Sequence, residues 1–123
     1  MSAVMDAFNV LQSVEGIDDI ATLELSDEQV ADTDDTIVLI TEVQSNYTAG
    51  YGSDRTTSFN DTVALNIFYG LSKSEQSDTL EQAIFDAMEN AGWYQTIAGA
   101  HIYDPYTHQY SIAKQFTHTK ERF

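Results

Sequence analysis

The chain has 123 residues, with 20 acidic residues against 5 lysines and arginines, a formal charge of −15 and no cysteine. This length suffices for one domain around one hydrophobic core. The negative field repels phosphate backbones, the lack of cysteine excludes disulfides and thiolate metal sites, and no run approaches the ~20 apolar residues that span a bilayer. We therefore expect a soluble cytoplasmic protein that neither binds DNA tightly nor enters a membrane.

The first part of the chain predicts one helix and two strands. Apolar residues recur at helical spacing over residues 4–14, and a glycine follows two positions later. Residues 20–25 have the composition of a short strand, and an acidic connection over residues 26–35 comes after them. The run TIVLITEV at residues 36–43 is almost wholly apolar or β-branched. It predicts a central strand that is covered on both faces.

Residues 44–61 have no sustained period and contain two closely spaced glycines, which predicts an 18-residue irregular loop. Loops of this length inside a small domain are usually functional or disordered. Tyr47, Tyr51 and Phe59 argue against simple disorder, because aromatic side chains in a polar loop tend to bury against a surface. We expect this loop to become ordered on a partner; the alternative is a flexible hairpin tip.

The strongest local signals lie in the second half. Residues 62–69 alternate between two faces and predict a strand. An amphipathic helix over residues 75–91 follows, with acids near its start and Gly92 suited to its left-handed C-cap. Its apolar stripe consists of Leu80, Ala83, Ile84, Ala87, Met88 and Ala91.

The end of the chain predicts an aromatic cover and a hairpin. Trp93 and Tyr94 are expected to fold back over the core. Residues 100–103 and 110–119 read as two antiparallel strands, joined by a turn at residues 104–109 that contains Asp-Pro.

These elements predict a single α+β domain over residues 1–123. Its sheet is expected to be mainly antiparallel, with about five strands, and to carry the N-terminal helix and one central amphipathic helix on one side. The long loop at residues 44–61 is expected to interrupt this compact unit.

Motifs for chemistry are weak. The acids of residues 32–35 suggest a calcium loop, but Ile37 and Val43 stand where an EF-hand needs glycine and glutamate. His101 and His108 can meet across the predicted hairpin, yet without further ligands at suitable spacing they do not define a zinc site. The sequence GYGSD before Arg55 lacks the third glycine of a dinucleotide loop. We assign no catalytic, cofactor-binding or metal-binding residue and predict that the protein is not an enzyme.

Several segments together resemble a family of small tail components of siphophages that infect lactobacilli and related bacteria. The similarity covers nearly the whole chain and lies in a pattern of strands and turns. The segments are Thr36–Val43, the turn at Tyr51–Asp54, Val63–Tyr69, the helix end Ala91–Trp93, Asp104–Gln109 and Phe116–Thr119.

More broadly, the layout is similar to that of tail terminators and tail-completion proteins of long-tailed phages. The resemblance implies a structural virion protein, assembled in the bacterial cytoplasm, that closes the head-proximal end of the tail tube as a six-fold ring. The implied partners are other copies of the chain, the major tail tube protein and the neck or head-completion proteins. DNA would pass through such a ring without binding tightly, since acids repel phosphates.

For the ring interface we predict two groups of residues. Tyr47, Tyr51, Arg55 and Phe59 of the long loop are the first candidates. The second group consists of bases that can pair with acids of a neighbour, and it comprises Lys114, Lys120 and Arg122.

Two other functions remain open at this level. A head–tail adaptor or neck protein shares the size, charge and fold class of a terminator. An acidic DNA mimic that inhibits a host enzyme is a further alternative, and the acids between Asp27 and Asp35 fit it weakly. A mimic would bind a nuclease or a polymerase, whereas an adaptor would bind the portal side of the junction.

Overall fold

The computed structural model describes residues 3–31, 33–52, 55–71, 74–105 and 108–121. Within these ranges it describes the backbone alone at residues 30–31, 44–52, 55–59, 74 and 120–121. The elements in chain order are α1 (Ala3–Leu11), β1 (Asp19–Thr22), α2 (Asp27–Ala31), β2 (Ile37–Gly52), β3 (Arg55–Phe68), the 3-10 turn η1 (Ser74–Gln76), α3 (Ser77–Asn90), β4 (Trp93–Ile97), β5 (Ile102–Tyr103) and β6 (Tyr110–Glu121).

One six-stranded sheet organises the chain. The strand order is β1-β2-β3-β6-β4, and β5 pairs with the start of β6. β1 runs parallel to β2, and all other pairs are antiparallel. The protein is therefore α+β with a mostly antiparallel open sheet, which confirms the predicted fold class.

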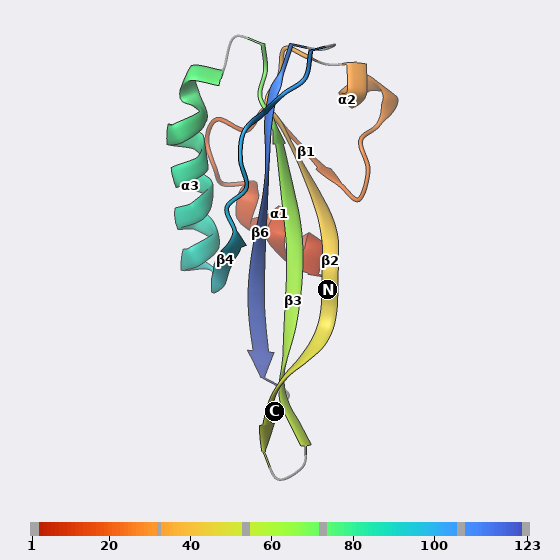
Figure 1. Cartoon of the computed structure of the whole chain (residues 1–123), viewed down its shortest axis with the longest axis vertical. Helices are drawn as coiled ribbons and strands as arrows, with labels where there is room; N and C mark the ends of the chain where they lie inside the picture. Colours follow the sequence, from red (N-terminus) through yellow and green to blue (C-terminus); the bar gives the residue numbers. More distant parts are fainter. Residues whose placement is uncertain (1–2, 32, 53–54, 72–73, 106–107, 122–123) are drawn as a thin grey trace.

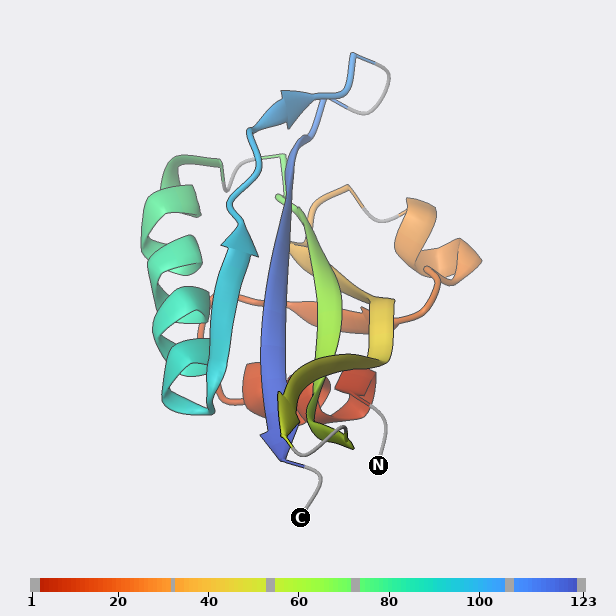
Figure 2. The same ribbon diagram turned by 60° about the horizontal axis from the view of Figure 1, so that its bottom comes forward.

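Both long helices pack against the same face of the sheet. In Figure 1, α1 lies behind the strands and α3 runs beside β4, and Figure 2 shows α3, β4, β6 and β3 side by side. α1 contacts β2, β3 and α3, while α3 contacts β4. A single core joins these elements, built from the inward faces of the strands and the apolar stripes of the helices. Its members with no exposed surface are Ala7, Leu11, Val38, Ile40, Val63, Leu65, Ile67, Ile84, Met88 and Phe116.

The periodic segments fold as their patterns predict. Val63, Leu65, Ile67 and Tyr69 alternate along one face of β3 and its end, and all four are buried. Leu80, Ile84 and Met88 of α3 point into the same core. Gly92 follows this helix with a φ of +93°, a left-handed conformation that suits glycine because it has no Cβ.

The acidic connection before β2 contains a short helix that was not predicted. Ser26 and Gln29 form a capping box at the start of α2: the Gln29 amide donates to Ser26 Oγ at 3.2 Å, and the Ser26 amide donates to Gln29 Oε1 at 2.9 Å. The Ser-x-x-Gln spacing was visible in the sequence. A helix of five residues leaves no hydrophobic period that would draw attention to it.

The prediction of an irregular loop at residues 44–61 is wrong, and the alternative of a hairpin is closer to the structure. β2 and β3 continue as an antiparallel ribbon, with pairs from Gln44–Thr62 to Gly52–Arg55 and register shifts between Glu42 and Tyr47. Figure 1 shows this ribbon extending beyond the body at the lower end of the molecule. The ribbon lies beyond the helix layer, so it needs no buried face and its sequence has no alternating apolar pattern. We call residues 43–60 the β2–β3 ribbon.

The region after α3 is also more ordered than expected. Trp93 and Tyr94 begin a strand that was not predicted, β4, which pairs antiparallel with β6. Trp93 is buried as predicted, and the centroids of its ring and the His118 ring are 5.3 Å apart. Tyr94 is instead 48% exposed, because successive strand residues point to opposite faces. The predicted hairpin is present, with β5 reduced to two residues.

Candidate functional site

A cluster of polar side chains surrounds Glu81, where α3 faces the sheet. Glu81 follows the buried Leu80 on α3, so its side chain leaves the helix beside the apolar stripe and reaches the strands. Tyr69 comes from the end of β3, Lys114 from β6 and His101 from the link between β4 and β5. Four segments that are distant in the sequence therefore meet at one carboxylate.

Both carboxylate oxygens of Glu81 have hydrogen-bond or ion-pair partners. The Tyr69 hydroxyl donates to Oε2 at 2.5 Å, and His101 Nε2 lies 2.8 Å from the same oxygen. Lys114 Nζ is 3.5 Å from Oε1, and it also donates to the Ala98 carbonyl oxygen at 3.2 Å. The side chains of Glu81 and Lys114 are only 13% and 10% exposed. The cluster is therefore a largely buried polar network.

The link that carries Ala98 and His101 lies close against β6. Gly99 has a φ of +72°, and a Cβ at this position would collide with the carbonyl oxygen of Ala113. Glycine therefore permits an approach that no other residue allows without a shift of the backbone. This approach brings the Ala98 carbonyl and the His101 ring to Lys114 and Glu81.

Proton positions in the cluster follow from its electrostatics. Burial raises the pKa of Glu81, but hydrogen bonds from Tyr69 and His101 and the charges of His101 and Lys114 outweigh burial and hold it below the ordinary value. Burial, followed by the hydrogen bond to Glu81 and its charge, raises the pKa of Tyr69 far above the ordinary value. At neutral pH the carboxylate is thus ionised and the phenol keeps its proton.

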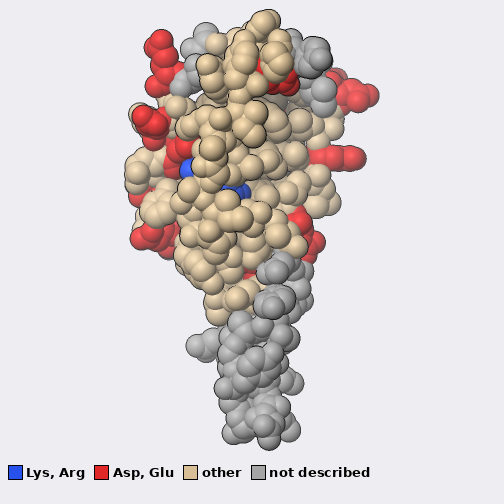
Figure 3. Space-filling view, in the orientation of Figure 1, with Lys and Arg blue, Asp and Glu red and all other residues tan. Residues whose placement is uncertain are grey.

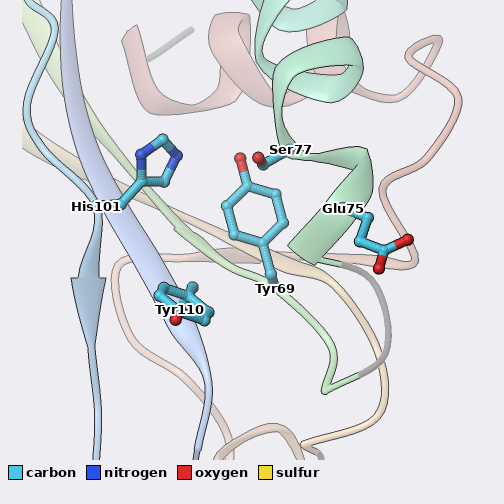
Figure 4. A pocket seen from close by; sticks show the side chains of 5 residues that line it. All are labelled: Tyr69, Glu75, Ser77, His101 and Tyr110. Carbon is cyan, nitrogen blue, oxygen red and sulfur yellow. The ribbon is translucent and has the colours of Figure 1, made fainter.

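A pocket of about 380 Å³ opens beside this cluster. It is lined by Tyr69, Glu75, Ser77, His101 and Tyr110. Figure 4 shows the Tyr69 ring in the middle, with His101 and Tyr110 on one side and Ser77 and Glu75 on the other. The pocket therefore combines aromatic rings with a polar group on each of its five lining side chains.

We call this cluster of Glu81, Tyr69, His101 and Lys114 the clamp, because its contacts hold several elements together. Both oxygens of the ionised Glu81 carboxylate have polar partners. The Tyr69 hydroxyl donates a hydrogen bond to one of them, and the charge of Lys114 is balanced by the carboxylate. These groups tie α3, β3, β6 and the β4–β5 link together. Within the described part of the chain, no group of three or more His, Cys, Asp or Glu side chains is placed to hold a metal ion.

The other two histidines also have partners within the chain. His108 Nδ1 lies 2.6 Å from the Tyr103 hydroxyl, and the His118 ring packs on Trp93. His101 and His108, which a zinc hypothesis would bring together, instead contact Glu81 and Tyr103.

The structure places the predicted interface residues on strands instead of a loop. Tyr47 and Tyr51 lie on β2, and Arg55 and Phe59 lie on β3, within the β2–β3 ribbon. Their backbone is described and their side chains are not. Ring formation through these residues stays a prediction.

The predicted bases divide into three cases. Lys114 is 8% exposed and pairs with Glu81 of its own chain, so it is not the free surface cation that we expected. Lys114 alternates along β6 with the buried Ile112 and Phe116, and this period in the sequence was a signal against a surface role. Lys120 lies on β6 without a described side chain, and Arg122 lies outside the described residues.

A surface that the sequence analysis did not single out lies along β4, β5 and the start of β6. Of the nine large hydrophobic residues that are exposed where the structure describes side chains, five lie here, and we call them the β4–β5 surface: Tyr94, Ile97, Ile102, Tyr103 and Tyr110. Tyr103 and Tyr110 are paired and share one face of the sheet, whereas Ile102 lies on the other face. Tyr103 and Tyr110 pack on each other with ring centroids 5.1 Å apart. Figure 3 shows acids along the sides of the molecule and few at its middle. The signal in the sequence was the absence of any charged residue from 90 to 103.

Comparison with known families gives one match. The model of a family described as "Protein of unknown function (DUF806)" matches residues 2–121, which is nearly the whole chain. No curated protein matches the chain. Among the helices that the structure describes, none is both long enough and apolar enough to cross a bilayer.

Proposed function

The chain belongs to the DUF806 family, whose description assigns no activity, and we propose that it is a structural subunit of a phage tail. In this proposal it resembles a tail terminator: several copies form a ring, six-fold by the same resemblance, that closes the head-proximal end of the tail tube. Its partners are the major tail tube protein and the neck or head-completion proteins. The ring assembles in the bacterial cytoplasm and remains in the virion.

The observation that carries this proposal is the β2–β3 ribbon. It extends beyond the helix-covered body (Figure 1). β1 pairs with β2 only over residues 37–40, so in the described sheet the outer edge of β2 has no strand partner from Thr41 to Gly52. An unpaired edge of this length presents backbone donors and acceptors to another chain. A protruding ribbon that meets a different surface on the next copy gives the heterologous contact from which rings are built.

The charge distribution is consistent with a conduit for DNA. Residues 1–61 carry 13 acids and one base, so most of the field comes from the first half of the chain. A lumen with this sign of charge repels the duplex and lets it slide without sticking. Passage of DNA thus needs no binding site for it.

Two measurements test the proposed function. Light scattering across a concentration series, at low and high salt, is expected to detect a species of several subunits that salt favours, because salt screens the repulsion between acidic copies. Electron microscopy of purified tail tubes mixed with the protein is expected to show one capped end. Protein that binds neither tubes nor itself contradicts the proposal, and protein that binds only the portal side of purified heads identifies an adaptor instead.

A further inference from the structure

Two segments of this acidic chain are almost free of charge. The β2–β3 ribbon, residues 43–60, contains one acid and one base, Asp54 and Arg55. Residues 90–113, which include β4, β5 and the start of β6, contain one charged residue, Asp104. The remaining 81 residues carry 18 acids and 4 bases. Two copies can therefore approach closely through these segments without bringing their acids together.

The ribbon and the β5 part of the second segment lie at opposite ends of the molecule, whereas β4 starts near the base of the ribbon, since Tyr94 pairs with Thr117 and Thr117 with Thr62. In Figure 1 the ribbon forms the lower end, and the chain between β4 and β6 rises to the upper end. Figure 2, in which the lower end is turned toward the viewer, shows β5 at the top and the ribbon in front of the lower part of the body. The ribbon tip and β5 therefore do not meet within one copy, so a contact between them joins the bottom of one copy to the top of another.

We propose that the β2–β3 ribbon of one copy packs on the β4–β5 surface of the next copy. This inference rests on the proposed ring and names the two surfaces that build it. The occupant of the β4–β5 surface is thus a second copy of this chain. The contact is head-to-tail, which closes into a ring when the rotation between copies allows it.

The apolar character of the β4–β5 surface supports the contact. Ile102 is 64% exposed, Ile97 is 48% exposed, and Tyr103 and Tyr110 are 46% and 43% exposed. Exposed aromatic and aliphatic residues of this kind supply the anchors of protein interfaces. The ribbon contains only two charged residues, Asp54 and Arg55, so covering the exposed apolar residues with it brings few charges into the contact.

The backbone also fits the contact. Of the described strands, β5 pairs with β6 alone, and β2 pairs beyond Ile40 with β3 alone. Both strands therefore have one edge without a strand partner. Addition of one edge to another satisfies backbone groups on both copies, as in recognition by strand addition.

Mixing two defective variants tests the polarity of the contact. Ile102→Asp places a charge on the β4–β5 surface, and replacement of residues 50–57 by Asn-Gly removes the ribbon tip. Each variant alone is expected to remain monomeric, whereas their mixture forms a 1:1 dimer and nothing larger, because one intact pair of surfaces remains. Leu23→Asp is the matched control, since Leu23 is 65% exposed and lies outside both segments; it is expected to assemble like the unmodified protein.

Disulfide trapping covers the case of weak association, because the chain has no cysteine of its own. Ile102→Cys is mixed with Thr48→Cys or Ala49→Cys, which sample the two faces of the ribbon. Cross-linked dimers are expected in at least one mixture and in neither variant alone. If no mixture cross-links more than its components, the inference is wrong, whatever the tube-capping assay reports. If the protein does not cap tubes, the proposed function is wrong, whatever the cross-linking reports.

Discussion

The helix-covered body and the β2–β3 ribbon share two strands, yet different forces hold them. In the body, β2 and β3 bury Val38, Ile40, Leu65 and Ile67 beneath α1 and α3. In the ribbon, the same two strands continue with backbone pairing but extend past the helices. Burial against a second layer produces a sequence pattern, whereas backbone pairing alone does not. This difference explains why one half of each strand was recognised and the other half was read as a loop.

Loss of a core side chain is expected to have the largest effect. Phe116→Ala removes a fully buried ring that packs beside Phe85 of α3. We expect it to lower the free energy of unfolding by about 3–5 kcal/mol, measured by urea denaturation. Tyr94→Ala on the neighbouring strand is the control, and its effect is expected to be much smaller because Tyr94 is half exposed. Equal losses would contradict the assignment of the core to one face of the sheet.

Loss of the Glu81 carboxylate from the clamp is expected to cause the second-largest loss of stability. Glu81→Ala leaves the largely buried ammonium of Lys114 without its carboxylate and frees the Tyr69 hydroxyl. We expect a loss of about 3 kcal/mol in urea denaturation at pH 7. Lys114→Met in the same background tests the cause, because it removes the unpaired charge and should restore part of the stability. A double variant no more stable than Glu81→Ala would contradict this account.

The clamp also predicts a pH dependence. The pKa of Glu81 is lower in the folded protein than its ordinary value of 4.5. The stability that it contributes is therefore fully present above about 4.5 and is lost as the pH falls through the folded value. The difference in unfolding free energy between the unmodified protein and Glu81→Gln is thus expected to shrink between pH 7 and pH 3. A difference that grows on acidification would show that folding does not lower the pKa of Glu81.

Loss of the α2 cap is expected to have a modest effect. Ser26→Ala removes the acceptor for the Gln29 amide at the start of a five-residue helix. We expect a loss of about 1 kcal/mol or less in the free energy of unfolding, measured in urea. Ser26→Asp keeps an acceptor at the cap and should retain the stability. If both variants behave alike, the cap contributes nothing.

Shortening of the ribbon is expected to have the smallest effect on the body. Ala49 and Ser58 are paired, so Asn-Gly in place of residues 50–57 closes them with a two-residue turn. We expect the urea midpoint to change little, since the helix-covered core is untouched. A large drop in the urea midpoint would show that the ribbon stabilises the body, and would contradict the view that different forces hold the two regions.

The sequence by itself determined the parts of the protein that bury a face. The alternation of residues 63–69 and the 3.6-residue stripe of α3 predicted their elements because each buries one face in the core between the sheet and the helices. Gly92 was identified as the end of α3 because few residues other than glycine adopt its backbone conformation. The mostly antiparallel α+β fold followed from the order of these elements.

Only the tertiary structure decided how distant segments meet. The contacts of Glu81 with Tyr69, His101 and Lys114 join residues up to 33 positions apart, and no local pattern encodes such a distance. The position of Lys114 was readable from the β6 period, but its partner was not. The ribbon depended on pairing between β2 and β3 alone, and backbone hydrogen bonds are available to almost any sequence. Local periodicity in the sequence reflects which side chains are buried, whereas strand partners and polar contacts are determined only when the whole chain folds.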